Sequence, residues 1–371
     1  MRLGLLQLRR ARRRTSVLIA TVVALTTLVL MVSTISSTLF TSLAGAVATM
    51  RADTVVLTSA AQGTVQASRV GTDRIDEVSR VDGVRRVAPV GETRVTVLLE
   101  GERLDASLFG IDPQGPGGPS ELVAGRLPTS PTEALADDAD VRRGVTLGSS
   151  LEVAGSATTV EIVGLTRGSR FGGLVTLYVP YETWHDVLTA LFPDATEIRP
   201  SLLAVDGTAG TDPEDLAARI TAGVDGVAAR TPTTAAMELP GLAGIRDSFR
   251  LIGLIAAGSA LLLIGAFWSL VTAQQAGTLA SLRAAGVATG HLVRALLVQV
   301  VVVVGTGVVL ASALLWAGGR QAPPTFPLTP EPTEVALIAL TLLAGGVAAV
   351  VPAIVRMLQI DPVTALAKAQ R

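Results

Sequence analysis

The stretch from Leu251 to Thr272 constrains this chain more than any other, because it contains 22 residues without a single charge. At a rise of about 1.5 Å per residue, a helix of this length spans roughly 33 Å, enough to cross the hydrocarbon core of a bilayer. A second uncharged run, from Leu296 to Ala317, predicts a helix that returns across the membrane. We expect transmembrane helices at about 249–273 and 293–317, and another at about 334–356.

The composition agrees with a membrane protein. Of the 371 residues, 49% are hydrophobic and only 16% are charged, an unusual balance for a soluble domain. The chain has no cysteine, which excludes disulfides and thiolate-bound metal clusters. The net charge of −1 gives no general attraction to nucleic acid.

The N-terminal segment predicts another membrane helix. Six arginines lie within Met1 to Arg14, and an apolar run follows from Val17 to Val47. A secretory signal peptide has an apolar core of only about 7–15 residues, so we interpret 1–50 as a cytoplasmic basic start and a retained first helix. By the positive-inside rule, residues 51–247 then lie outside the cell membrane, and both termini are cytoplasmic.

Residues 51–247 differ from the rest of the chain and predict a folded extracytoplasmic α+β domain of two lobes, one of them a small barrel-like piece at about 126–175. Pro-rich and Gly-rich residues 112–119 predict a loop. Helical spacing occurs at 72–81, 180–192 and 213–224. Alternating or β-branched runs predict strands at 54–57, 85–89, 93–99, 106–111, 150–153, 158–164 and 175–179.

The segment between the second and third predicted spans has its own pattern. Leu279, Leu282 and Gly286 fall on one helical face, with Arg283 beside them. A helix at about 277–290 is therefore expected on the cytoplasmic side, where a partner protein could bind it.

The order of one helix, a large external domain and three further helices resembles the MacB/FtsX-type permeases of ABC transporters. The match lies in Leu279-Ala-Ser-Leu-Arg-Ala-Ala-Gly286, similar to the coupling segment of that family, and in Ile360-Asp-Pro-Val-Thr-Ala-Leu366, similar to its C-terminal ending. One departure is Gln274-Gln-Ala-Gly277, where the family often has Arg-x-x-Glu. Residues 52–69, Leu108–Asp112 and Gly125 further resemble the branch that contains the haem exporter permease HrtB and the DevC-type permeases.

The resemblance implies an integral membrane α-helical fold of four transmembrane helices, with the α+β extracytoplasmic domain inserted between helices 1 and 2 and an FtsX-like permease domain at 248–371. It also implies a homodimer that works with a separate dimeric ATPase, coupled through Leu279, Leu282, Arg283 and Gly286. The sequence contains no Gly-x-x-x-x-Gly-Lys-[Ser/Thr] and only one lysine, Lys368, so the chain cannot build that phosphate-binding loop. We therefore expect a non-catalytic permease subunit.

If the transported ligand is haem, few residue types remain that could bind its iron, because cysteine is absent and only two histidines occur. The resemblance and the position above the second span favour Met237 and Glu238 as ligands of the haem iron. Met31 could line the same pocket, and Arg246 and Arg250 could pair with the propionates. Alternatively, Glu238 caps a helix that begins at Pro240, Met237 and Met31 only pack, and the arginines reach lipid phosphates.

Three functions stay open at this point. The first is export of haem from the membrane, with no intrinsic cofactor and haem as the transported ligand. The second is export of another amphiphile, such as a lipid, glycolipid, lipoprotein or peptide. The third is a non-transporting FtsX-like transmembrane signalling subunit. Tyr178, Tyr181 and His185 are close in sequence but are weaker haem candidates, because their segment predicts a strand and a core tryptophan, Trp184.

Overall fold

The computed structural model describes residues 12–274, 289–321 and 332–359 of the chain. These residues form two compact units. The helical unit comprises residues 12–36, 247–274, 289–321 and 332–359. The β-domain comprises Ser37–Arg246.

Four long helices occur in the described parts of the chain: α2 (Arg12–Ala48), α7 (Leu242–Gln274), α9 (Thr289–Gly319) and α10 (Pro332–Gln359). Among the described residues, three segments are long and apolar enough to cross a membrane: Ile19–Ala48, Leu242–Leu270 and Leu297–Gly319. The predicted fourth span falls on α10, where Pro332–Ala348 is apolar and the sequence is uncharged from Val335 to Val355. Three of the predicted spans thus meet this criterion.

Apolar side chains from all four helices pack together in the helical unit. Trp268 of α7 is almost fully buried, beside Val22 of α2 and Val300 of α9. Gly307 allows α9 to approach α2 closely, because a Cβ atom there would lie 2.5 Å from a methyl carbon of Val22. Small residues at such points are typical of helices packed in a membrane.

One lobe of the β-domain has a βαββαβ order. Its strands are β1 (Thr54–Thr58), the first half of β2 (Val84–Leu99), β9 (Leu202–Gly207) and β10 (Val227–Arg230). They pair antiparallel in the order β10-β1-β9-β2, with α3 (Thr72–Ser79) and α5 (Pro213–Gly223) packed against them. This is the ferredoxin-like arrangement, and we call it the ferredoxin-like lobe.

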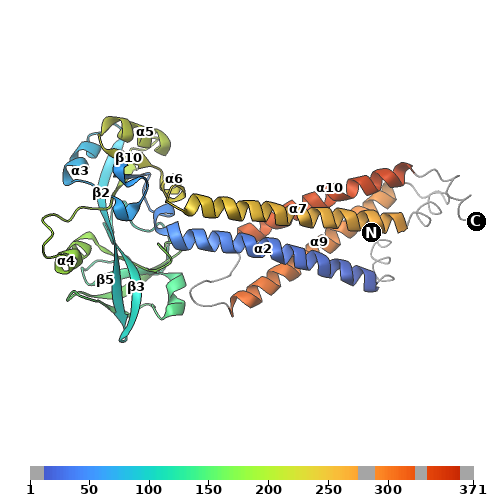
Figure 1. Cartoon of the computed structure of the whole chain (residues 1–371), viewed down its shortest axis with the longest axis horizontal. Helices are drawn as coiled ribbons and strands as arrows, with labels where there is room; N and C mark the ends of the chain where they lie inside the picture. The colour runs from blue at the N-terminus through green and yellow to red at the C-terminus, as the bar shows by residue number, and fades with distance from the viewer. Residues whose placement is uncertain (1–11, 275–288, 322–331, 360–371) are drawn as a thin grey trace, which may run out of the picture. The chain divides into compact units, whose positions relative to one another are not determined.

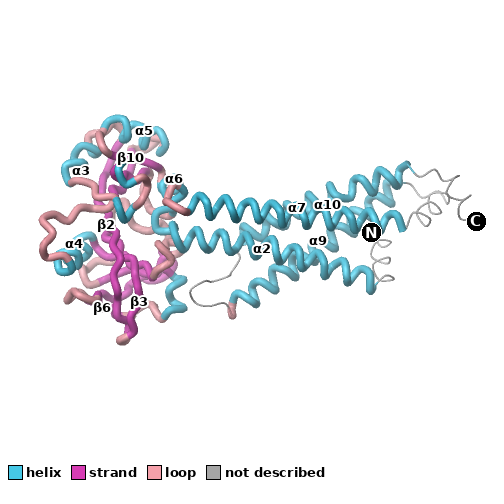
Figure 2. The backbone as a smooth tube through the Cα atoms, viewed as in Figure 1, coloured by secondary structure: helices cyan, strands magenta, loops and turns pink. Residues whose placement is uncertain are grey.

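The other lobe is inserted between β2 and β9. Its strands are the second half of β2, β3 (Glu102–Ile111), β4 (Leu122–Gly125), β5 (Glu133–Asp137), β6 (Ser150–Val153), β7 (Thr159–Thr166) and β8 (Val175–Pro180). Pairing runs β2-β3-β8-β5-β7, and β6 pairs with both β7 and β2, so the strands close into a ring. We call this the barrel lobe. Helix α4 (Tyr181–Leu191) packs against it, as Figure 2 shows.

The barrel lobe is larger than the predicted piece at 126–175, because the ring needs β3, β8 and half of β2 as well. The strands predicted at 85–89 and 93–99 form one continuous strand, β2, which passes through both lobes (Figure 1). Strands β4, β5, β9 and β10 were not predicted. Their short segments alternate weakly or consist of alanine and leucine, and long-range pairing rather than local preference makes them strands.

The connection from the β-domain to α7 differs from the prediction. A helix beginning at Pro240 was expected, but a separate short helix, α6 (Pro232–Met237), comes first, and α7 begins at Leu242. Gly241, at a φ of 84°, separates the two helices. A left-handed residue of this kind ends helical hydrogen bonding and favours glycine.

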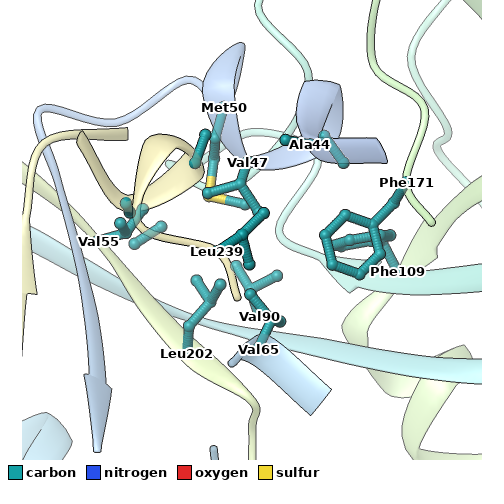
Figure 3. Close-up of a cluster of buried hydrophobic side chains, with 14 of the residues drawn as sticks. Ala44, Val47, Met50, Val55, Val65, Val90, Phe109, Phe171, Leu202 and Leu239 are labelled. Carbon is teal, nitrogen blue, oxygen red and sulfur yellow. The ribbon is translucent and has the colours of Figure 1, made fainter. Parts of the chain in front are cut away.

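The core of the β-domain includes residues from both points where the long helices enter it. Ala44 and Val47 near the end of α2, and Met50 just after it, are buried together with Leu239 and Leu242 at the start of α7. Figure 3 shows Val47, Leu239 and Val90 side by side in this cluster. One hydrophobic core therefore contains both the end of α2 and the start of α7.

Removal of the Trp184 side chain should destabilise the barrel lobe. Trp184 is 1% exposed and packs on the backbone of Gly91 and Gly110. We expect Trp184→Ala to lower the free energy of unfolding by about 3–5 kcal/mol, as measured by urea-dependent proteolysis of the full chain in detergent. Phe192→Ala, at an exposed position at the end of the same helix, should change it by less than about 0.5 kcal/mol. Equal effects of the two variants would contradict the assignment of Trp184 to the core of the barrel lobe.

Candidate functional site

Met237 and Glu238 lie together at the end of α6, in the β-domain. Met237 is the last residue of the helix and is 40% exposed. The amide of Glu238 donates a hydrogen bond to the carbonyl of Thr234 (3.0 Å), which fixes the backbone, while its side chain is exposed. A thioether and a carboxylate are therefore accessible next to the start of α7.

The carboxylate of Glu238 has a partner that the sequence did not indicate. The Nε atom of Arg230, at the end of β10, donates to its two oxygens at 3.2 and 3.4 Å. Glu238 is the C-terminal cap of α6 and not the N-terminal cap of a helix that begins at Pro240, so that alternative is wrong in its geometry. Arg230 and Glu238 are eight residues apart, and no helical or strand spacing relates them. The sequence therefore did not predict their pairing.

Arg230 also borders a hollow of about 540 Å³ between α5, β10 and α6. Its wall is mostly alanine and threonine, with Glu214 at the edge. Hydroxyl groups of the wall are engaged locally: Thr221 accepts from the amide of Ala229 at 2.9 Å, and Thr231 donates to Thr234 at 2.9 Å. The hollow therefore offers small side chains, one guanidinium group and one carboxylate to a ligand.

The other predicted ligand residues are distributed over both units. Met31 lies on α2 in the helical unit and is 43% exposed. Arg246 and Arg250 lie one turn apart on α7, Arg246 in the β-domain and Arg250 in the helical unit, and both are exposed. Residues four apart share one helical face, so the two guanidinium groups project from the same side of α7.

The helical unit contains an apolar hollow of about 260 Å³ between α2 and α7. Its lining includes Val22 from α2 and Phe267 and Trp268 from α7. Thr21 is the one polar residue in this lining. The hollow can accommodate an apolar group but has no charged residue to orient one.

Of the three weaker haem candidates, Tyr178 and Tyr181 pack in the β-domain. Tyr178 is buried, and its hydroxyl donates to the carbonyl of Ser169. Burial raises the pKa of Tyr178 and raises that of Tyr181 to about 12, and Tyr181 packs on Trp184 with ring centroids 5.3 Å apart. His185 is exposed on α4.

The residues predicted to couple to an ATPase, Leu279, Leu282, Arg283 and Gly286, and the C-terminal segment 360–366 lie outside the described residues. Within the described ranges, no group of three or more His, Cys, Asp or Glu side chains could bind a metal ion. Glu238 and Met237 therefore stand as an isolated pair of candidate iron ligands, without a surrounding cluster of acidic or imidazole groups.

Comparisons with known proteins give one curated relative and several solved structures. The chain is 28% identical, over 105 residues, to the putative hemin transport system permease protein HrtB of Staphylococcus haemolyticus; the match spans 28% of this chain and 30% of that protein. No protein-family model matches the chain.

Two solved structures overlap the chain in part. The periplasmic region of MacB from Actinobacillus actinomycetemcomitans covers 50% of this chain and 91% of its own length, at 14% identity and a TM-score of 0.36. The extracellular domain of the noncanonic ABC-type transporter YknZ from Gram-positive bacteria covers 48% of this chain and 100% of its own, at 18% identity and a TM-score of 0.31.

The curated match and the motifs at 279–286 and 360–366 agree with each other, since both lead to permeases of one class. The chain thus resembles the MacB/FtsX-type permeases of ABC transporters, and a haem permease is among its similar relatives.

Proposed function

We propose that this chain is the permease subunit of an ABC-type efflux transporter, spans the cell membrane four times, acts as a homodimer and exports haem with force from a separate ATPase. The observation that carries the proposal is the length of α2 and α7. They contain 37 and 33 residues, so they measure about 55 and 50 Å, against a hydrocarbon core of about 30 Å. Each helix continues from the helical unit into the β-domain.

Long continuous helices of this kind transmit displacement, because the intrahelical hydrogen bonds make them stiff along their axis. An ATPase that binds the cytoplasmic segment at 277–290 can therefore move the β-domain without contacting it. The ligand binds in this scheme at the end of α6, shortly before α7, where Met237 and Glu238 are exposed. Haem as the cargo is supported by the similarity to a putative hemin transport permease and by the accessibility of these two side chains.

In this proposal Met237 and Glu238 bind the haem iron, while Met31, Arg246 and Arg250 contact the porphyrin and its propionates. A thioether and a carboxylate are both possible ligands of haem iron. Arg230 competes with the iron for Glu238, because its Nε atom lies 3.2 Å from the carboxylate. Iron ligation by Glu238 would therefore weaken the Arg230–Glu238 ion pair.

A hemin titration of the detergent-purified protein tests the cargo and the site together. We expect a saturable shift of the haem absorption band near one haem per dimer, and at least about tenfold weaker binding in Met237→Ala and Glu238→Ala. Glu197→Ala is a matched control, because Glu197 is an exposed carboxylate that also pairs with an arginine, Arg199. A featureless, non-saturating signal would leave a different amphiphile, or a signalling role, as the better function.

The competition between Arg230 and the iron gives a second expectation. Both side chains of the Arg230–Glu238 pair are about half exposed, so Arg230→Ala should change the free energy of unfolding by less than about 1 kcal/mol. The same variant should bind hemin up to about fivefold more tightly, because the energy of the Arg230–Glu238 ion pair no longer opposes iron ligation by Glu238. Weaker binding would mean that Arg230 holds Glu238 in position for the ligand.

The coupling segment is tested by charge reversal. Replacement of Leu279, Leu282 or Arg283 by acidic residues should abolish stimulation of the partner ATPase by this chain, while membrane insertion and purification yield stay normal. Arg103→Glu, in the β-domain, serves as the control for an altered net charge. Unchanged stimulation in the three variants would remove the coupling role from this segment.

A further inference from the structure

The loop that joins β7 to β8 forms backbone hydrogen bonds with the end of helix α2. This loop, Gly168 to Leu174, has the sequence Gly-Ser-Arg-Phe-Gly-Gly-Leu. The amide of Ala46 donates to the carbonyl of Arg170 at 2.9 Å, and the amides of Gly172 and Gly173 donate to the carbonyls of Leu43 and Ser42 at 3.1 and 2.9 Å. We call this set of bonds the α2 clamp.

The helix and the loop approach each other so closely that a side chain could not fit between them. A Cβ atom on Gly45 would lie 2.2 Å from the carbonyl oxygen of Gly168 and 3.2 Å from that of Arg170. Phe171 extends the contact into the core, where its ring meets that of Phe109 edge-on at 5.4 Å (Figure 3). The clamp therefore combines backbone hydrogen bonds with an aromatic anchor.

Two buried carboxylates bind the loop and the start of β8. Asp137 accepts hydrogen bonds from the amide and the hydroxyl of Ser169 at 2.7 and 3.1 Å. Asp140 accepts from the amide of Thr176 at 3.1 Å, and its other oxygen lies 3.3 Å from Nε of Arg170. Asp140 is fully buried and Arg170 is only 3% exposed, so each charge depends on the other for compensation.

The guanidinium group of Arg170 also shapes the loop itself. It donates to the carbonyls of Gly173 and Leu174 at 3.2 and 3.3 Å, which closes the loop around its own arginine. Arg143 adds a second positive charge, 3.8 Å from Asp140, and donates to the carbonyl of Gly173 at 3.4 Å. Arg170 and Gly173, which bond to α2, thus also take part in the contacts of the ion pair.

We propose that Asp140 and Arg170 are positioning residues that fasten the transmembrane helix α2 to the barrel lobe, by holding the Gly168–Leu174 loop against the helix. The fastening itself follows from the contacts within the β-domain. Its use, to carry movement of α2 into the barrel lobe during export, rests on the function proposed above.

Hydrogen exchange of the full chain in detergent tests the clamp without transport or ATP. Burial raises the pKa of Asp140 to about 6, against the opposing effect of Arg170, so the measurement is made near pH 8, where Asp140 is charged. We expect Asp140→Asn to lower the protection of the amides of Ala46, Gly172 and Gly173 at least about tenfold. Protection of β3 should stay unchanged.

Asp138→Asn is the matched control, because Asp138 lies on the same 3₁₀ helix, Asp138–Arg143, but pairs with the exposed Arg167. Arg170→Gln should reproduce the loss, and the double variant Asp140→Asn with Arg170→Gln should be no worse than either single variant. That non-additivity is expected only if the two residues act through their pairing.

Gly45→Ala tests the clamp from the side of the helix, without altering the ion pair. Its methyl group should displace the loop and lower protection at Gly172 and Gly173, whereas Gly305→Ala, at a helical glycine with open space around it, should not. Unchanged protection in both Asp140→Asn and Gly45→Ala would overturn the proposal. Equal loss of protection throughout the barrel lobe would overturn it too, because the ion pair would then support the lobe in general.

Discussion

The structure depends on the burial of the end of helix α2 in the core of the β-domain. Ala44, Val47 and Met50 lose their contact with solvent there, in the same cluster as Leu239 and Leu242, which lead into α7. Burial of apolar surface is non-directional. The cluster alone therefore holds the end of α2 and the start of α7 in the core, but does not fix which residue of α2 faces which residue of the β-domain. The directional part comes from the hydrogen bonds between α2 and the Gly168–Leu174 loop.

The two lobes of the β-domain are likewise joined by contacts that the structure describes. The ring of strands in the barrel lobe is joined to the ferredoxin-like lobe by the unbroken strand β2, and Glu92 lies where β2 passes between them. Burial raises the pKa of Glu92, and the hydroxyl of Ser107 donates to its carboxyl group at 2.8 Å. The amide of Glu92 in turn donates to the hydroxyl of Ser201, just before β9, so hydrogen bonds cross from one lobe to the other.

The proposed ligand site adjoins the buried cluster at the end of α2 and the start of α7. Met237 and Glu238 directly precede Leu239, a member of the buried cluster, so a ligand held by these side chains touches the segment that links the β-domain to α7. Two opposed demands then meet within a few residues. The core requires apolar side chains that exclude water, whereas iron ligands must stay accessible. The short helix α6 meets both requirements, because Ala235 and Ala236 are buried and Met237 is exposed.

Local features of the sequence determined the membrane-crossing helices, the α+β character of residues 51–247 and most of the strands that alternate clearly, because length, charge and periodicity act over neighbouring residues. The candidate ligands Met237 and Glu238 could be named from the sequence and the resemblance. Only the tertiary structure decided that the barrel closes through β2, β3 and β8, that α7 begins at Leu242, that Glu238 pairs with Arg230 and that Asp140 pairs with Arg170. Strand closure and buried ion pairs join segments distant in sequence, and their energies arise from desolvation and geometry that exist only once the chain has folded.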